Sequence, residues 1–376
     1  MIDQQQVSQS IGTRTARVLS VWGLLILIIA LVAAFSLIEP TTFPTFFDLQ
    51  SILSNKSILA MVALAVMIPM AANHFDLSVG YMVGIAQVLA IGLQVNQGLP
   101  WWVAALLVVA LGAGVGFVNG VLVTRVHIDS FIATLGTGTV LYGLDEWYTG
   151  GQQIVGTLPK GFTNLAATLG AGHGIPMPAI YLLVIAIVLW VVFEYLPVGR
   201  FLYVLGANPR AAELNGITAQ RHVTRAFVAA GALSAFAGVI LEAELRVGQA
   251  SVGPEYLLPA FTGALLGATS VRPGWVNVWG TVLAVFVLAV AVAGLQQLGA
   301  AFYVEQLFNG SMLIVAVGLA VNATRRKTRI RISSRQPAAP PPPTDGAGSS
   351  LSKVPPGSTP VGPKTAGDSS FGFRKE

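Results

Sequence analysis

Residues 18–38 read VLSVWGLLILIIALVAAFSLI, a run of 21 residues without a charged side chain. A helix rises about 1.5 Å per residue, so this run is long enough to cross a hydrocarbon core about 30 Å thick. It follows Arg14 and Arg17, as the apolar part of a secretory signal does. However, it is longer than a typical signal core, and no small-x-small cleavage pattern closes it. We therefore interpret it as a membrane-spanning helix that stays in the chain.

The composition of the whole chain points the same way. Charged residues make up 10% of the 376 positions and hydrophobic residues 54%, whereas an average soluble protein has about 25% charged residues. The chain has no cysteine, which excludes disulfides, thiolate metal sites and cysteine nucleophiles. The predicted fold class is an all-α polytopic membrane protein.

Apolar runs of spanning length recur along the sequence. The second, fifth and eighth are short or interrupted by Gly, Pro or polar residues, so we expect some broken or re-entrant helices among them. The ten predicted transmembrane helices are 18–38, 57–73, 77–97, 100–124, 129–147, 178–196, 223–245, 255–270, 276–298 and 303–322.

The distribution of basic residues orients these segments. With ten spans and a cytoplasmic start, 18 of the 21 Lys and Arg residues lie on the cytoplasmic side, and only Lys56, Lys160 and Arg246 lie outside. Cytoplasmic loops are enriched in Lys and Arg, so the count of ten agrees with this rule. Both termini are predicted to be cytoplasmic.

The chain divides into three predicted parts. Residues 1–17 form a cytoplasmic N-terminal segment, and 18–325 form the transmembrane domain, whose largest cytoplasmic loop is 197–222. Residues 326–376 are first basic and then rich in Pro, Ser and Gly. Such a composition buries too little apolar surface to fold, so a disordered cytoplasmic tail is expected.

Polar groups inside the spans are few. Asp76 precedes a predicted helix and is expected to cap it, and single buried amides usually bond neighbouring helices. Glu242 and Glu244 lie near the outer end of the seventh span, either as charges at the membrane interface or as part of an outer gate or a docking surface for a binding protein. The candidate translocation-pathway residues are Asp76, Gln87, Asn119, Phe131, Thr134, Gln296 and Gln297.

Chemical machinery is missing from the sequence. There is no G-x-x-x-x-G-K-[ST] phosphate-binding loop. The four histidines have no metal-ligand spacing, and we expect neither a catalytic residue nor a metal site nor a cofactor bound by this chain. A polytopic conduit powered from elsewhere is the remaining interpretation.

One short stretch of the large loop stands out, because GANPRAAELNGI (206–217) carries helix signals at both ends. Asn208 is a favoured N-cap, Pro209 suits the first helical position, and Gly216 suits the left-handed residue after the last turn. A helix from Pro209 to Asn215 is predicted. It is too short to be stable alone in water and too polar to enter a bilayer.

Four segments of the chain carry a family pattern in the same order: FDLSVGYMVGI (75–85), FIATLGTGTVLYGL (131–144), PVGRFLYVLGANPRAAELNGI (197–217) and LLGATSVRPGWVNVWGTVLA (265–284). Together they resemble the ribose/xylose-type permeases of bacterial ATP-binding-cassette importers. The similarity covers roughly residues 18–325. The usual Gly-Gly-Thr-Ser stands here as Gly267-Ala268-Thr269-Ser270, and the usual Ser before the loop's Gly-Ile is Asn215.

The resemblance implies a permease that imports a monosaccharide or related polyol through a bacterial cell membrane. It implies a dimer of permease chains, a cytoplasmic ATPase that holds ATP and Mg²⁺, and an extracytoplasmic sugar-binding protein. The helix after Asn208 would be the coupling helix that docks on the ATPase. Its residues would be Gly206, Asn208, Pro209, Arg210, Ala211, Ala212, Glu213, Leu214, Gly216 and Ile217.

Two other classes of transporter remain open. One is an importer of the same superfamily for nucleosides or branched-chain amino acids. The other is an ion-coupled secondary transporter, which would need acids or exposed carbonyls at mid-membrane. The sequence offers only Asp76 near a helix end for that purpose.

Overall fold

The computed structural model describes residues 3–40, 43, 45–169 and 174–333, with side chains described between 21 and 318 in those ranges. The chain divides into two units, Met1–Arg331 and Ile332–Glu376. The expected disordered tail lies outside the described residues beyond Ser333. Its first part, from Arg326 to Ser333, continues the last helix.

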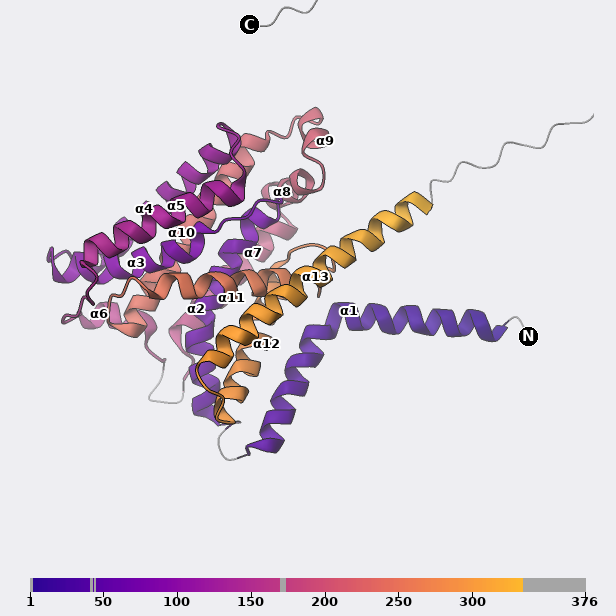
Figure 1. Ribbon diagram of the computed structural model, residues 1–376, viewed down its shortest axis with the longest axis horizontal. Helices are drawn as coiled ribbons and strands as arrows, with labels where there is room; N and C mark the ends of the chain where they lie inside the picture. Colours follow the sequence, from indigo (N-terminus) through magenta and orange to yellow (C-terminus); the bar gives the residue numbers. More distant parts are fainter. Residues whose placement is uncertain (1–2, 41–42, 44, 170–173, 334–376) are drawn as a thin grey trace, which may run out of the picture. The chain divides into compact units, whose positions relative to one another are not determined.

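Helices are the main secondary structure of the described residues, which contain no strand beyond two isolated bridges, Ile154 with Gly248 and Thr168 with Pro176. The all-α class is therefore confirmed (Figure 1). The helices are α1 (Asp3–Ile38), α2 (Phe46–Met70), α3 (Ser78–Val95), α4 (Trp101–Thr124), α5 (Ser130–Thr149), α6 (Lys160–Thr163), the 3-10 turn η1 (Asn164–Ala166), α7 (Met177–Glu194), α8 (Pro197–Ala207), α9 (Pro209–Leu214), α10 (Ala219–Leu245), α11 (Val252–Gly267), α12 (Val278–Gln297) and α13 (Tyr303–Ser333).

Each of the ten predicted spans coincides with one helix. Among the described residues, seven helices are long and apolar enough to cross a membrane: α1, α2, α3, α4, α7, α10 and α12. The predicted spans in α5, α11 and α13 are helical but are not among these seven. Ten crossings and the orientation of the termini therefore stay predictions.

Helix α2 differs most from its expected segment. It begins at Phe46, eleven residues before the predicted start, and it runs unbroken to Met70. The side chain of Thr45 caps it by accepting from the Asp48 backbone N–H at 3.2 Å. The hydropathy pattern missed this first part because Ser51, Asn55 and Lys56 are polar, yet a polar turn can continue an apolar helix where it lines a cavity.

Helix α10 packs against α4, α3 and α2, and α11 packs against α12. The tightest crossing is that of α4 with α10, where the glycines spaced by four in α4 face the other helix. A methyl group at Gly116 would overlap the carbonyl oxygen of Phe227, and one at Gly112 would overlap that of Gly231. Close backbone contact of this kind holds membrane helices together when water exclusion gives little driving force.

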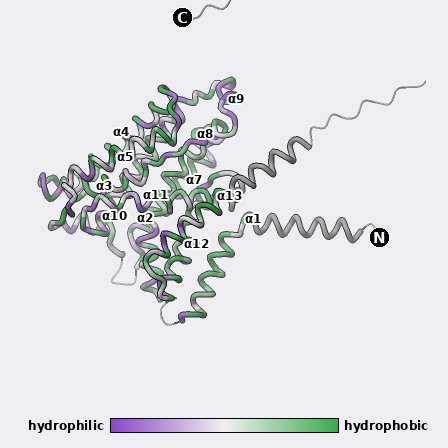
Figure 2. The backbone as a smooth tube through the Cα atoms, in the orientation of Figure 1, coloured by the Kyte–Doolittle hydropathy of each residue, from purple (hydrophilic) through white to green (hydrophobic). Residues whose placement is uncertain are grey.

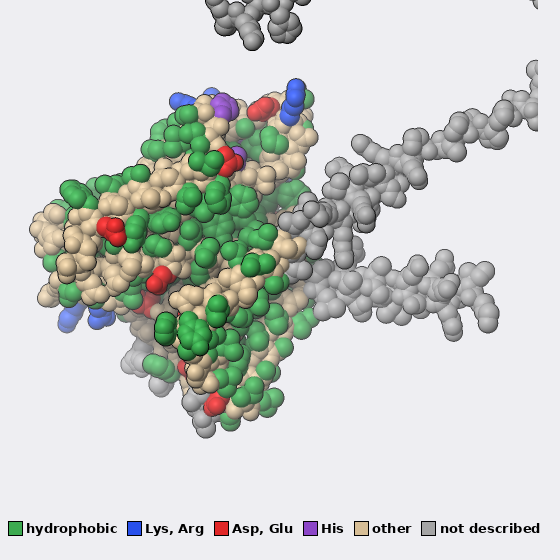
Figure 3. All heavy atoms as spheres, viewed as in Figure 1, with side chains coloured by type: hydrophobic (Ala, Val, Ile, Leu, Met, Phe, Trp, Pro, Cys, Tyr) green, Lys and Arg blue, Asp and Glu red, His purple; other side chains and the backbone are tan. Residues whose placement is uncertain are grey.

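The surface agrees with a chain that spans a membrane. Hydrophobic residues dominate the described half of α1, and hydrophilic residues gather around α9 (Figure 2). On the face shown in Figure 3, Lys and Arg appear at two opposite edges, with mainly hydrophobic side chains between them. Helices α4 and α7 also carry exposed large hydrophobic side chains, such as Leu106 and Val184.

Candidate functional site

The loop between α7 and α10 contains the helix that the caps predicted. Helix α9 begins at Pro209 and ends at Leu214, one residue before the expected end. The Asn208 side-chain oxygen accepts the Ala211 backbone N–H at 3.0 Å, which satisfies one of the four free N–H groups of the first turn. The N-terminal end of this six-residue helix is thus fixed by its own sequence.

The other end of α9 is closed by two crossed backbone bonds. The Ile217 N–H donates to the Ala212 carbonyl at 3.0 Å, and the Gly216 N–H donates to the Glu213 carbonyl at 2.9 Å. Gly216 has φ +78°, a conformation that glycine adopts without a steric penalty. This arrangement is the Schellman motif.

Burial divides α9 into an anchored side and an open side. Ala212 is completely buried, while Arg210 and Glu213 are exposed. Leu214 is 85% exposed, more than any other large hydrophobic side chain in the described ranges. Helix α9 thus holds one apolar side chain out from the chain while Ala212 anchors its opposite side.

Helix α8 ties α9 to the rest of the chain. A methyl group at Gly206 would overlap the Ala71 carbonyl oxygen, so the end of α8 lies directly against the end of α2. The Tyr203 hydroxyl donates to the Val276 carbonyl oxygen at 2.7 Å, and its ring packs edge-on against Trp275 at 5.5 Å. The turn between α11 and α12 is therefore attached to α8.

Two further properties strengthen this attachment. Arg272 in the same turn forms an ion pair with Glu194 at the end of α7. Burial raises the pKa of Tyr203 to about 12, so the phenol keeps its proton at neutral pH and remains a hydrogen-bond donor. The pKa of Tyr203 is higher in the folded state than in the unfolded state. The contribution of its protonated phenol to the free energy of unfolding is therefore complete below about pH 10 and is lost as the pH rises towards 12.

Three of the polar pathway candidates, Asp76, Asn119 and Thr134, lie close together where the start of α3 contacts α4 and α5. Ser78 donates its hydroxyl to Asp76 Oδ1 at 2.6 Å and accepts from Asn119 Nδ2 at 2.8 Å. Asn119 Oδ1 in turn accepts from the Thr137 hydroxyl at 2.7 Å. Thr134 accepts the Leu77 N–H at 3.0 Å. We call Asp76, Ser78, Asn119, Thr134 and Thr137 the buried polar network.

Asp76 was expected to cap α3, but the N-cap residue of this helix is Leu77, which makes no side-chain cap bond. Asp76 Oδ1 also accepts the Ser78 N–H at 3.0 Å, while the Leu77 N–H is taken by Thr134. Asp76 is completely buried. The network thus holds the start of α3 against α4 and α5, and structure maintenance explains these contacts without a bound solute.

Phe131 lies next to the network but faces a different environment. It is half exposed and lines an apolar pocket of about 300 Å³. Phe75 and Phe261 stack in that pocket with ring centroids 6.3 Å apart. The structure therefore brings Asp76, Asn119, Thr134 and Phe131 into one region.

The remaining pathway candidates lie elsewhere. Gln87 is buried, donates to the Val247 carbonyl and accepts the Gln249 N–H at 3.4 Å, which ties α3 to the segment after α10. Glu242 lies beside Gln87 and is completely buried, and its role in docking or in an outer gate stays a prediction. Glu244 is partly buried beside Ser54.

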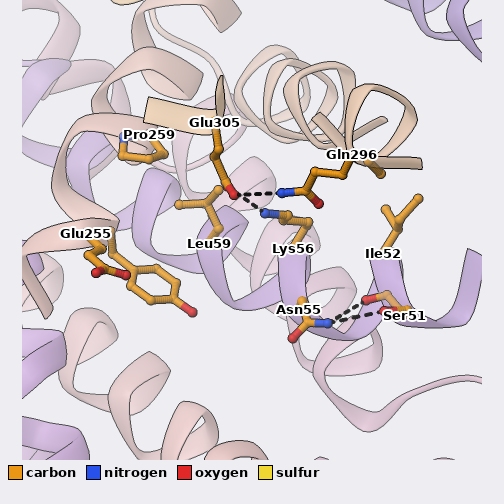
Figure 4. A pocket seen from close by; sticks show the side chains of 11 residues that line it. Ser51, Ile52, Asn55, Lys56, Leu59, Glu255, Pro259, Gln296 and Glu305 are labelled. Atoms are coloured by element: carbon orange, nitrogen blue, oxygen red, sulfur yellow. Dashed lines mark hydrogen bonds and ion pairs between the residues drawn. The ribbon is translucent and has the colours of Figure 1, made fainter. Parts of the chain in front are cut away.

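Gln296 belongs to a polar cavity of about 330 Å³ between α2, α11, α12 and α13 (Figure 4). Its amide donates to Glu305 Oε2 at 3.1 Å, and Lys56 pairs with Glu305 Oε1 at 3.3 Å. Gln297 is partly buried and does not line this cavity. The two neighbouring glutamines thus have different surroundings.

The buried polar network makes a stability prediction. Changing Asn119 to alanine removes the donor to the Ser78 hydroxyl and the acceptor of the Thr137 hydroxyl, and losing such a partner in a buried site costs about 1–3 kcal/mol. We expect Asn119→Ala to lower the midpoint of thermal unfolding in detergent, measured by tryptophan fluorescence. Asn164→Ala, at an exposed position, is the matched control. Equal midpoints for the two variants would contradict a stabilising role of the network.

Sequence reasoning missed several of these residues. Ser78 and Thr137 are hydroxyls that no pattern singled out, and Tyr203 looked like an ordinary loop aromatic. Lys56 and Glu305 carried a usable signal, because opposite charges stand at the ends of two predicted spans on the same side of the membrane. That coincidence predicts an ion pair at equal depth.

The comparison with known families covers every site described above. A family model described as the permease component of a branched-chain amino acid transport system matches residues 49–317. The chain belongs to this permease family. Its described helices and this membership establish a multi-pass protein of the bacterial cell membrane.

Several relatives of this permease are known by their transport function. The ribose import permease RbsC of Haemophilus influenzae is 31% identical over 297 residues, covering 78% of this chain and 90% of that protein. RbsC of Bacillus subtilis is 33% identical over 298 residues, with coverages of 78% and 89%. The galactose/methyl galactoside import permease MglC of Salmonella typhimurium is 29% identical over 317 residues, with coverages of 79% and 93%. No solved structure matches the permease.

Proposed function

We propose that this chain is the membrane-spanning permease subunit of an ATP-binding-cassette importer for a monosaccharide or related polyol. The observation that carries the proposal is its similarity to ribose import permeases along 78% of its length. The family's own description names amino acids, but the relatives with sugar names include ribose and galactose import permeases. The chain forms the translocation pathway and hydrolyses nothing itself.

The proposed topology has ten spans with both termini in the cytoplasm. The positive-inside distribution of 18 basic residues against three supports it. Helix α9 then lies on the cytoplasmic side, while Lys56, Glu305 and the polar cavity lie at the extracytoplasmic ends of their helices. These two locations suit a motor on one side and solute entry on the other.

The proposed partners are those that the resemblance to ATP-binding-cassette importers implies. A cytoplasmic ATPase holds ATP and Mg²⁺ and receives α9 in a groove, an extracytoplasmic binding protein delivers the sugar, and a second permease chain completes the pathway as a homodimer or heterodimer. Leu214 and Ala211 supply the apolar contact with the ATPase, and Arg210 and Glu213 flank it. Glu244 remains a candidate for an outer gate.

Motion of α9 has a structural route into the membrane. Helices α8 and α9 should move together, because a single residue, Asn208, joins them. The Tyr203 hydroxyl of α8 donates a hydrogen bond to the carbonyl oxygen of Val276. Val276 belongs to the turn that connects α11 with α12. A displacement of α9 at the ATPase therefore reaches two helices that extend to the polar cavity at the opposite end.

The transport assay decides between the substrate classes. The purified chain is reconstituted in liposomes with the ATPase and the binding protein encoded beside it, and uptake of labelled D-ribose, D-galactose, L-leucine and adenosine is measured with and without ATP. ATP-dependent uptake of a sugar is expected. Uptake of only leucine or adenosine would favour the other importers of the superfamily, and uptake driven by an ion gradient without ATP would favour a secondary transporter.

The topology makes its own prediction. Because the chain has no cysteine, single cysteines can be introduced without a background. In inside-out and right-side-out vesicles, Glu213→Cys should react with an impermeant maleimide only from the cytoplasmic side, and Lys160→Cys only from outside. The reverse pattern would overturn the proposed orientation.

A further inference from the structure

The polar cavity between the ends of four helices has an unusual composition for a surface between spans (Figure 4). Its volume of about 330 Å³ lies at the lower end of the range for small-molecule sites, about 300–1,000 Å³. Most of its walls come from α2 and α11, and α12 and α13 close it. The side chains with hydrogen-bonding groups are Ser51, Asn55, Lys56, Glu255, Tyr256, Gln296 and Glu305.

Hydrogen bonds within the cavity leave its charges partly balanced. Both carboxylate oxygens of Glu305 are engaged, one by Lys56 at 3.3 Å and the other by Gln296 at 3.1 Å. The Asn55 amide donates to the Ser51 carbonyl oxygen at 3.1 Å. The single cation of the cavity is therefore already paired, and no free fixed positive charge is left for the carboxylate of a solute.

We propose that this cavity binds a neutral polyhydroxylated solute of monosaccharide size as it enters the permease. The inference rests on the proposed function and names a place of contact for its substrate. Every sugar hydroxyl both donates and accepts. Amides such as those of Asn55 and Gln296 offer both roles, the carboxylates of Glu255 and Glu305 accept, and the ammonium of Lys56 donates.

The apolar part of the wall completes the match. Ile52, Leu59, Pro259 and Ala293 line the cavity beside the polar groups. A sugar ring presents C–H groups on its faces and hydroxyls around its edge, so a wall with both kinds of surface suits it. A zwitterionic amino acid would instead require one unpaired cation and one unpaired anion at a short distance, and the bond between Lys56 and Glu305 removes the first.

The position of the cavity offers a connection between solute binding and the proposed cytoplasmic ATPase. Helices α11 and α12 carry Glu255, Pro259, Ala293 and Gln296, and the same two helices are joined at the other end by the turn that Tyr203 holds. Moving that turn changes the position of two walls relative to α2. Binding in the cavity is accordingly weak and reversible, because an importer must release its cargo.

The first experiment measures occupancy by chemical protection. Ser51→Cys places a thiol on the cavity wall with little change in side-chain size, and its rate of reaction with an impermeant maleimide is measured in the full-length permease in nanodiscs. At a sugar concentration about three times a millimolar Kd, about three quarters of the sites are filled and labelling slows about fourfold. Gln152→Cys, exposed in the segment after α5, is the control.

D-ribose, D-galactose and L-leucine are the probes. Slower labelling of Ser51→Cys by a sugar and not by leucine, with the control unchanged, supports the proposal. Equal rates with and without either sugar overturn it, and so does protection by leucine alone.

The second experiment separates the cavity from the proposed function as a whole. Gln296→Leu keeps the side-chain volume but removes the amide, and the loss of one hydrogen bond to the solute predicts an uptake rate about tenfold lower at subsaturating sugar. Gln152→Leu is the matched control. If the unchanged complex takes up sugar but Gln296→Leu does so equally well, the cavity proposal fails alone. If the unchanged complex takes up no sugar, the proposed function fails with it.

Discussion

Exchanging Leu214 for aspartate should abolish ATP-driven sugar uptake while leaving the permease folded. The side chain is 85% exposed in the isolated chain, so its replacement costs the fold almost nothing. In the complex, α9 would carry a charge into an apolar groove of the ATPase. Loss of a central apolar contact and burial of an unpaired charge together cost at least about 2 kcal/mol, which is about 30-fold in affinity.

The measurement is uptake of labelled sugar in proteoliposomes, together with co-purification of the ATPase. Leu169→Asp is the matched control, because Leu169 is also exposed and lies in the segment between α5 and α7 that we place outside the cell. Ala211→Trp, on the same helix, should reproduce the defect by obstruction. Normal uptake by Leu214→Asp would remove α9 as the site of coupling.

The second large effect concerns the crossing of α4 with α10. Gly116→Ala adds one methyl group that overlaps the carbonyl oxygen of Phe227. A backbone atom cannot turn aside as a side chain can, so the two helices must separate and lose contacts along their length. Overpacking of this kind typically costs about 1–3 kcal/mol, and we expect the upper end of that range.

Gly114 offers a control on the same helix. A methyl group there meets no atom within 4 Å, and alanine favours a helix over glycine by about 1 kcal/mol. The midpoint of thermal unfolding in detergent should therefore fall for Gly116→Ala and stay level or rise for Gly114→Ala. The size-exclusion peak of the folded protein should shrink only for Gly116→Ala. Equal unfolding temperatures would show that the α4–α10 crossing is looser than described.

The features that the sequence predicts well are those determined over a few residues. The caps of α9 depend on Asn208, Pro209 and Gly216, all within one short segment, and each was readable before the fold was known. The glycines at every fourth position of α4 likewise indicated a contact face. Neither property depends on which distant segment lies opposite.

Features that depend on distant partners were not predicted, although the ion pair of Lys56 with Glu305 left a signal in the charges at the ends of two spans. Ser78 meets Asn119 across 41 positions, and Lys56 meets Glu305 across 249. The start of α2 was misplaced for a related reason, because hydropathy treats Ser51 and Lys56 as unfit for a membrane helix unless the cavity they line is known. Gln87 and Gln296 seemed equivalent in the sequence, and only the packing separates them.

The glycine contacts of α4 also limit how this transporter moves. Sliding α10 along α4 by one turn, about 5.4 Å, would bring the branched side chain of Val108 or Val123 to a place where only hydrogen now fits. These contacts hinder sliding of α10 along α4, so we expect the two helices to move as one rigid pair. We expect alternating access in the proposed importer to come from movement around this pair, with α11 and α12 as the moving helices, because their connecting turn is attached to α8 by the Tyr203 hydroxyl.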